Sequence, residues 1–371
     1  MTQTLRQAAG SLLVVGLSGK ELTALECAWL KLIRPAGIIL YKRNIADAKQ
    51  SRALLQEATA FCVASSVRFV DVEGGTVNRL NEALAPIPSA QAVATASQYT
   101  GKPALCQEHG DLIACAVAAF GFNTSLAPMV DLGLPDSAEV LGTRCASPDP
   151  AAVIDYARNF LTGLSSRGIV GCGKHFPGLG GGALDSHLET PAIQRSTADL
   201  WRDDLEPYRA LRGQLPMVMI NHAAYPQTPS RDCPASVSRY WIETVLRKRI
   251  GYRGIVLSDD LEMGGILKFM PIAEAAVEAI RTGSNLLEIC HHAEPILAAY
   301  EALIAEAERS SAFAKLLLAR ARESQRKRLR TFSAAPLPAL SARQFEALRK
   351  RIQRFSETIA KAQPAAQDTL A

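Results

Sequence analysis

Several features that would mark common classes of protein are missing from this chain of 371 residues. No apolar run approaches the ~20 residues that a helix needs to cross a bilayer, so we expect no membrane span. The net charge is only +5, and the basic runs at residues 326–330 and 349–354 contain no aromatic residue that could stack on bases. These runs are typical of solvated helix faces, and we expect no nucleic-acid partner.

The chain also lacks the residue spacings of metal centres. Its eight cysteines include no C-x-x-C pair, and Cys62, Cys115 and Cys172 lie inside apolar runs, where cysteine acts as a small hydrophobic residue. The apolar segment near the N-terminus is better explained as a first buried strand than as an export signal, so we expect a cytoplasmic location with reduced thiols. The adjacent His291 and His292 would point to opposite sides of a strand and form no chelate. We therefore expect neither a metal nor another cofactor.

What the chain does contain is a set of eight short β-rich runs bounded by turn signals. Most of these runs are continuously apolar, which is the pattern of parallel strands covered on both faces. Helix-like segments lie between several of them, at residues 22–32, 104–119, 151–165, 240–249 and 273–282. The strand-like runs are residues 12–17, 37–41, 67–71, 121–128, 168–173, 217–222, 254–259 and 285–290.

Eight strands that alternate with helices predict an α/β fold, a (β/α)8 barrel of the TIM type. An open, doubly wound sheet is the alternative, and it is less well supported because no G-x-G-x-x-G motif opens a helix after the first strand. We expect one catalytic domain over residues 1–332. Residues 333–371 are expected to form a linker, an amphipathic helix at 344–361 and a disordered tail.

Polar residues lie where several predicted strands end, at the face where barrel enzymes place their chemistry. They are Asp71, Lys174, His175, His222 and Asp259. Asp259 is followed at once by a second acid, Asp260, and adjacent side chains of a strand point to opposite faces. We therefore expect at most one of these two acids to face the mouth of the barrel; the other interpretation is a turn or a helix cap.

A glycine-rich loop follows Lys174 and His175 and ends in Asp185-Ser186-His187. If the loop end is extended, the side chains of Asp185 and His187 lie on the same side. The carboxylate would then orient the imidazole and raise its basicity, as a general acid/base at neutral pH requires. A surface turn with an incidental histidine is the alternative.

Two other signals are weak on the residues alone. The DVEGG segment from Asp71 to Gly75 could bind substrate hydroxyls, hold a metal or cap a helix. Arg144 stands in the segment LGTRCASPDP, which has no strong local pattern, and a surface arginine is the simplest interpretation.

Taken together, these segments resemble the single-domain β-N-acetylglucosaminidases of glycoside hydrolase family 3, the NagZ type. The resemblance covers about residues 12–290, and the most specific signal is K-H-F-P-G…D-S-H followed by S-D-D-L-x-M. The segments that carry it are GIILYKRN, DVEGGTVNRL, FNTSLAPMVDL, LGTRCASPDP, GKHFPGLGGGALDSH and PASVSRYWIETVLRKRIGYRGIVLSDDLEM.

The resemblance implies a retaining glycosidase that removes terminal β-linked N-acetylglucosamine, with peptidoglycan fragments as the expected substrate. Asp259 would be the nucleophile, and His187, held by Asp185, would be the acid/base where other retaining enzymes use a second carboxylate. The positions that hold the sugar hydroxyls in this family match Asp71, Arg79, Arg144, Lys174 and His175.

The chain departs from the family pattern at two positions. Leu179 replaces the second histidine of H-F-P-G-H-G, and Thr76 replaces an arginine after E-G-G. Neither position is the expected nucleophile or acid/base, but both could alter loop closure or the leaving-group site. These departures leave open a sugar-binding protein without activity. A phosphorylase on the same fold also stays open, because a neutral histidine acid/base does not repel phosphate as a carboxylate would. The oligomeric state is left open.

Overall fold

The computed structural model describes residues 4–182, 190–332 and 339–364 of the chain. Its centre is a ring of eight parallel strands in the order β6-β3-β2-β1-β10-β9-β8-β7. Bridges from Thr124 to Val170 and from Met129 to Lys174 close the ring between β6 and β7. The strands are β1 (Leu13–Val15), β2 (Gly37–Ile39), β3 (Val67–Val70), β6 (Thr124–Ser125), β7 (Cys172–Phe176), β8 (Met217–Ile220), β9 (Ile255–Asp260) and β10 (Leu286–Ile289).

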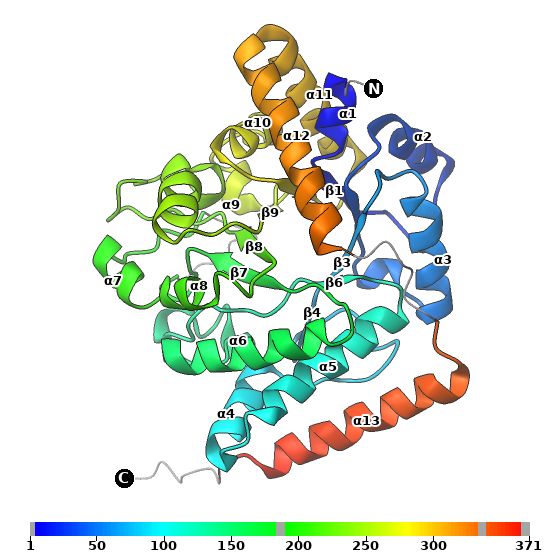
Figure 1. Ribbon diagram of the computed structural model, residues 1–371, viewed down its shortest axis with the longest axis vertical. Coiled ribbons are helices and arrows are strands. Elements are labelled where there is room, and N and C mark those ends of the chain that lie inside the picture. Colours follow the sequence, from blue (N-terminus) through cyan, green and yellow to red (C-terminus); the bar gives the residue numbers. More distant parts are fainter. Residues whose placement is uncertain (1–3, 183–189, 333–338, 365–371) are drawn as a thin grey trace.

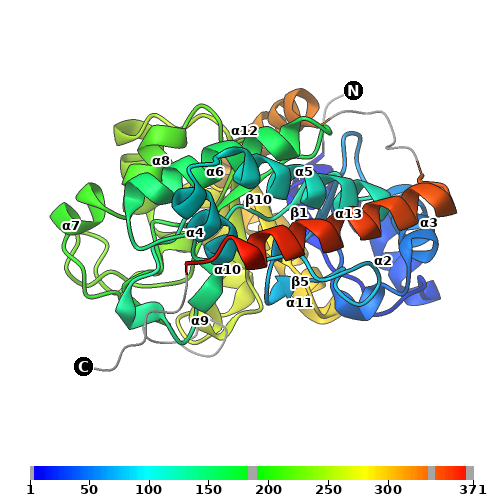
Figure 2. The same cartoon turned by 90° about the horizontal axis from the view of Figure 1, so that it is seen from below.

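Helices surround this ring, as Figures 1 and 2 show, and the predicted (β/α)8 barrel is confirmed. One of them, over Tyr240–Arg249, is a π-helix. The α-helices are α1 (Leu5–Gly10), α2 (Ala24–Ile33), α3 (Ala48–Thr59), α4 (Ala90–Thr100), α5 (Ala104–Ala119), α6 (Pro150–Ser165), α7 (Thr197–Arg202), α8 (Glu206–Leu211), α9 (Gly264–Leu267), α10 (Ile272–Thr282), α11 (Ala293–Arg309), α12 (Ser311–Thr331) and α13 (Ala342–Lys361).

Alternation along the strands divides the apolar residues between two cores. On β1, Val14 points into the barrel, whereas Leu13 and Val15 pack against the surrounding helices. The barrel interior is small and filled by side chains such as Phe69 and Met217. Both faces of each strand are therefore buried, which explains the continuously apolar runs in the sequence.

One end of the barrel is closed by α12, which crosses in front of the strands in Figure 1. Lys327 on this helix donates hydrogen bonds to the carbonyl oxygen of Gly254 and to Oδ1 of Asn285, just before β9 and β10 begin. Phe332, at the end of α12, packs into the interior core. The amino ends of the strands are thus covered, and the carboxyl ends are left for a site.

A short hairpin, β4 (Val72–Gly74) and β5 (Val77–Asn78), follows β3 and was not predicted. Its tight turn needs glycine, because Gly74 has φ of 92° and a Cβ there would lie 2.1 Å from the carbonyl oxygen of Pro88. The hairpin places Glu73 beside the carboxyl end of β7, where it contacts Lys174.

The predicted strand at residues 168–173 starts too early, since β7 runs from Cys172 to Phe176. Lys174 and His175 therefore lie within the strand and not after it. The prediction ended the strand at the first charged residue. Lys174 can stay in the sheet because Asp71 and Glu73 neutralise its charge.

The C-terminal helix α13, predicted at 344–361, lies along α4 and α5 on the outside of the barrel (Figures 1 and 2). Leu348, Ile352, Phe355 and Ile359 form its buried stripe. Arg351 pairs with Asp111 of α5 at 2.6 Å. The linker and tail predictions fall largely on residues outside the described ranges, and the domain division stays a prediction. No helix in the described part of the chain is apolar and long enough to span a bilayer.

Candidate active site

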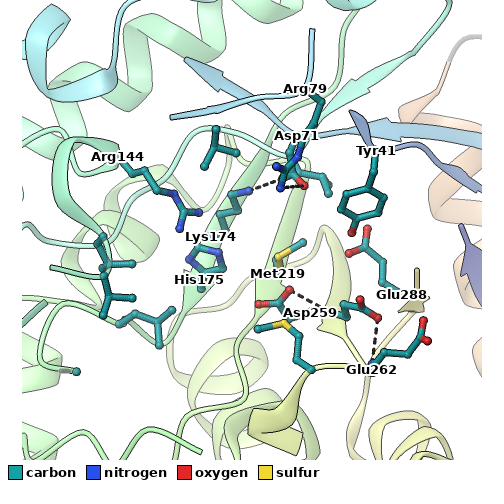
Figure 3. A pocket seen from close by; sticks show the side chains of 18 of the residues that line it. Tyr41, Asp71, Arg79, Arg144, Lys174, His175, Met219, Asp259, Glu262 and Glu288 are labelled. Atoms are coloured by element: carbon teal, nitrogen blue, oxygen red, sulfur yellow. Dashed lines mark hydrogen bonds and ion pairs between the residues drawn. The ribbon is translucent and has the colours of Figure 1, made fainter. Parts of the chain in front are cut away.

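A cavity of about 790 Å³ opens at the carboxyl ends of the barrel strands (Figure 3). Acidic and basic side chains from β3, β7, β9 and β10 share its wall with a few apolar ones. Those that matter below are Tyr41, Asp71, Arg79, Arg144, Lys174, His175, Leu179, Asp259, Asp260, Glu262, Glu288 and His291. All five residues predicted to hold sugar hydroxyls are among them.

A buried ionic network forms one side of this cavity. Lys174 Nζ lies 2.7 Å from Asp71 Oδ1 and 2.6 Å from Glu73 Oε1. Arg144 makes two hydrogen bonds to Glu73, from Nε at 3.0 Å and from Nη2 at 2.9 Å. Burial alone would raise the pKa of Glu73, but Arg144 and Lys174 hold it far below its usual range. Glu73 is thus a fixed anion that positions two cations.

The simplest interpretation of Arg144, a surface arginine, is wrong. Its side chain is only 16% exposed because its guanidinium group forms an ion pair with the buried carboxylate of Glu73. Burial would lower the pKa of Arg144, but Glu73 raises it further above its ordinary value. The residue that explains Arg144 is 71 positions away in the sequence, and no local pattern could have connected the two.

Asp131 holds His175 in place. Nδ1 of His175 lies 2.7 Å from Asp131 Oδ2, and the backbone N–H of His175 donates to the same oxygen at 3.0 Å. The N–H of Leu179 donates to Asp131 Oδ1 at 2.8 Å. The carboxylate therefore fixes the Nδ1–H tautomer of His175 and ties the strand to the loop that follows. Asp131 was not predicted as a site residue, although it stands in the quoted segment FNTSLAPMVDL.

Both Asp259 and Asp260 line the cavity, so the expectation that at most one would face the barrel mouth is wrong. The reason is an irregularity in the pairing of β9 with β10: Leu286 aligns with Leu257, but Glu288 aligns with Asp260. The extra residue on β9 breaks the simple alternation of side chains. Oδ1 of Asp259 accepts the N–H of Asp260 at 2.9 Å.

His222, at the end of β8, does not reach the cavity. It is fully buried, with Nδ1 2.7 Å from Ser236 Oγ and Nε2 3.0 Å from the carbonyl oxygen of Asp260. Because a carbonyl only accepts, Nε2 carries the proton. Burial lowers the pKa of His222 more than the nearby Asp259 raises it. His222 therefore supports the backbone of the Asp259–Asp260 pair.

Among the other residues that line the cavity, four that bear on its chemistry were not predicted as site residues: Tyr41, Glu262, Glu288 and His291. Glu288 had a visible signal, because it is a charged residue in the middle of the apolar run NLLEIC. His291 Nε2 lies 3.1 Å from Asp260 Oδ2, a contact made across two different strands.

Asp185 and His187, the predicted dyad, lie outside the described residues. The two departures from the family pattern lie within them. Leu179 is buried and lines the cavity, and Thr76 is exposed at the hairpin turn, next to Val77 of the cavity wall.

The chain matches known proteins over most of its length. Residues 4–321 match the family described as "Glycosyl hydrolase family 3 N terminal domain". The "Beta-hexosaminidase" of Haemophilus influenzae strain PittEE is 34% identical over 289 residues, which cover 77% of this chain and 81% of that protein. The "Beta-hexosaminidase" of Alkalilimnicola ehrlichii is 37% identical over 289 residues, covering 76% and 82%.

Solved structures agree with this match. A family 3 β-N-acetylglucosaminidase from Paenibacillus sp. superposes with a TM-score of 0.83 at 29% identity, over 95% of this chain and 69% of that one. NagZ from Neisseria gonorrhoeae superposes with a TM-score of 0.75 at 26% identity, over 96% of this chain and 98% of that one. The same enzyme in complex with N-trifluoroacetyl-D-glucosamine gives a TM-score of 0.74 at 27% identity, again over 96% and 98%.

Proposed function

Because the chain belongs to glycoside hydrolase family 3, we propose that it is a retaining exo-β-N-acetylglucosaminidase. Its substrate would be a short saccharide with a terminal β-linked N-acetylglucosamine. The names of the relatives support the reaction and the sugar. The observation that carries the proposal is the position of Asp259, which borders the cavity on the side away from Lys174 and Arg144 (Figure 3).

Asp259 would be the nucleophile. One of its oxygens, Oδ1, already accepts the N–H of Asp260, which leaves Oδ2 for the attack. Oδ2 would form a bond to the anomeric carbon while the bond from that carbon to the leaving oxygen breaks. His187, paired with Asp185, would give its proton to the leaving oxygen and afterwards take one from the water that releases the sugar.

Five residues would hold the hydroxyl groups of the sugar. Lys174 and Arg144 are fixed by Glu73, and His175 is fixed by Asp131, so their donors are oriented before substrate arrives. Asp71 and Arg79 complete the set; Arg79 Nη2 lies 3.9 Å from Asp71 Oδ2. Charged donors and acceptors of this kind make strong hydrogen bonds to a polar ring.

Peptidoglycan fragments are the natural substrate that the resemblance implies, and we extend the proposal to them. They would present N-acetylglucosamine at one end. Leu126 and Met219 of the packed barrel interior line the cavity and close its floor, as an exo-acting enzyme requires. A cytoplasmic location stays a prediction.

The test is release of 4-nitrophenol from 4-nitrophenyl β-N-acetylglucosaminide by wild type, Asp259→Ala and His187→Ala. We expect Asp259→Ala to lose activity on the order of 10⁴-fold or more, because the nucleophile has no substitute. Asp232→Ala is the matched control, since Asp232 is exposed in the described structure and does not line the cavity. His187→Ala should lose more on substrates with poor leaving groups than on this activated one.

Product analysis separates the remaining functions. Proton NMR of the first-formed sugar should show the β anomer, as double displacement requires. Sugar 1-phosphate formed in phosphate buffer would make the protein a phosphorylase. Zero turnover with tight binding of N-acetylglucosamine would make it a binding protein. Activity that survives in Asp259→Ala would show that the nucleophile is assigned wrongly.

A further inference from the structure

Glu288 is an ionisable residue within a buried strand of the barrel. It is the third residue of β10, whose other residues are Leu286, Leu287 and Ile289. Only 2% of Glu288 is exposed, yet its side chain lines the cavity. Among the described residues, its Oε1 atom is buried and has no hydrogen-bond partner. An unpartnered buried oxygen costs stability, so the position is not explained by the fold.

The carboxyl group of Glu288 is placed on the same side of the cavity as Asp259. Figure 3 shows it beside Tyr41, with Asp259 below and Lys174 on the opposite side. The titratable and charged groups that interact with it come from five strands or strand ends: Tyr41, Asp71, Cys172, Lys174, Asp259, Asp260 and Cys290.

These surroundings favour the protonated form of the Glu288 carboxyl group over the ionised form. Burial raises the pKa of Glu288 well above its ordinary value, and the negative charges of Asp71, Asp259 and Asp260 raise it further. Lys174 lowers it only partly, because that ammonium is already shared by Asp71 and Glu73. The protonated form that these surroundings favour carries one O–H donor and one free acceptor.

Hydrogen-bond donors from neighbouring residues are engaged elsewhere. Arg43 Nη1 lies 3.0 Å from Nδ1 of His291, and a guanidinium only donates, so Nδ1 is the acceptor. The ring proton of His291 is then on Nε2, directed at Asp260 Oδ2 at 3.1 Å. Asp259 and Asp260 are acceptors. The donors of Arg43 and His291 are therefore directed at partners other than Glu288.

We propose that Glu288 is a specificity-determining residue that hydrogen-bonds a hydroxyl group of the sugar bound beside Asp259. The proposal rests on the proposed function. A neutral carboxyl group offers a donor and an acceptor side by side, and a hydroxyl group has one of each. Such a site favours a hydroxyl over a carboxylate substituent, because the neighbouring carboxylates would repel the latter.

The test uses Glu288→Leu and Glu288→Gln with 4-nitrophenyl β-N-acetylglucosaminide and its 3-deoxy, 4-deoxy and 6-deoxy analogues. On the parent substrate, Glu288→Leu should lose about tenfold in kcat/KM, the value of one hydrogen bond to a buried group. On one deoxy analogue this loss should vanish, which identifies the hydroxyl. Glu288→Gln, which keeps a donor and an acceptor, should recover most of the loss.

Two further readouts separate this function from a structural one. Without ligand, Glu288→Leu should raise the Tm by about 2 °C, because it removes an unpartnered polar atom. In wild type, KM should rise as the pH increases through the raised pKa of Glu288, and this rise should be absent in Glu288→Gln. If the leucine variant does not fold, the glutamine variant decides by the pH profile and the same analogues.

The control is Glu306→Gln, which removes a mostly buried carboxylate of α11 away from the cavity and should leave the preference among analogues unchanged. Equal losses by Glu288→Leu on all four substrates, or a lower Tm with no change in KM, would overturn the proposal. Failure of wild type to hydrolyse any of them would instead refute the proposed function.

Discussion

Glu73 and Arg144 face each other edge to edge beneath the cavity wall, joined by two parallel hydrogen bonds of 3.0 and 2.9 Å. Oε1 of the same carboxylate lies 2.6 Å from Nζ of Lys174, so one anion orients two cations. A two-pronged pair of this kind fixes direction as well as charge. The position of both cations therefore depends on a residue that need not touch substrate.

Replacement of Glu73 by glutamine should uncouple this network. Glu73→Gln leaves two buried cations with less compensation, and breaking a buried ion pair costs about 3–5 kcal/mol. We expect that loss in the free energy of unfolding, measured by urea denaturation, together with a higher KM. Glu82→Gln is the control, because Glu82 pairs with Lys42 at the surface and should cost less than ~1 kcal/mol. Equal costs for the two variants would contradict the argument.

Asp131 should act on the reaction through His175. In Asp131→Asn the side chain can present N–H to Nδ1, which would favour the wrong tautomer of His175. A charge-assisted hydrogen bond is worth about 1.5–3 kcal/mol, so we expect kcat/KM to fall roughly tenfold to a hundredfold. Steady-state kinetics against Asp136→Asn, an exposed acid outside the cavity wall, provide the comparison. A fall of the same size in both variants would count against a specific role.

The stability of the protein should depend on pH through Asp204. Burial raises the pKa of Asp204 to about 7 from its ordinary 3.8, and Arg195 lowers it only partly. Arg195 Nε lies 2.9 Å from Oδ2 of Asp204, but within the described residues neither oxygen has a hydrogen-bond partner. Between these two pKa values the folded state holds a proton that the unfolded state has lost. The free energy of unfolding therefore falls as pH rises through this window.

Asp204→Asn should remove the fall in the free energy of unfolding that occurs as the pH rises. The variant should be more stable than wild type at pH 8, and the difference should shrink as the pH is lowered towards 4, as thermal unfolding would show. Asp203→Asn is the matched control with the opposite sign. Hydrogen bonds from Arg202 lower the pKa of Asp203, so its ionised form stabilises the fold and its replacement should cost stability at pH 8. A constant difference between Asp204→Asn and wild type across this range would refute the prediction.

The contact between α13 and the barrel should contribute to global stability. The ring of Phe355 stacks on His109 of α5 with centroids 6.1 Å apart, and both residues are buried. Phe355→Ala removes a large buried side chain and should cost about 3–5 kcal/mol in a single cooperative transition. Arg354→Ala, on the exposed face of the same helix, should change little. A separate early transition in wild type would show that α13 unfolds on its own.

The ring of strands could be predicted because both faces of each strand are buried and the runs are apolar. The helix at 104–119 was predicted with the bounds of α5, whereas α3 was missed. Strand ends were less certain, since β7 continues through Lys174, whose charge is neutralised by residues far away in the sequence. An apolar run in the sequence predicts a buried strand. It does not predict that an ion pair with distant residues allows a charged residue to be buried in the same strand.

The residues of the candidate site likewise divide into those with a signal in the local sequence and those without one. Asp259, Lys174 and His175 were predicted because each comes directly after or close behind an apolar run, and Arg79 and Arg144 because motifs resemble a family. Glu73 and Asp131 act through partners that are far away in the sequence, and pairings such as Asp131 with His175 are set by the closure of the ring. The irregular pairing of β9 with β10, which turns both acids into the cavity, has no local signature in the sequence.

The pairing of β1 with β10 has a consequence for how the protein is made. Val14 of β1 is the register partner of Glu288 of β10. One edge of β1, the first strand to be synthesised, therefore stays without its hydrogen-bonding partner until nearly the whole barrel has been synthesised. Contacts between such distant parts of a chain slow folding, and an apolar strand with a free edge invites wrong pairing. The nascent chain thus spends most of its synthesis with an unsatisfied strand edge, and the wall that carries Glu288 exists only once synthesis has passed β10.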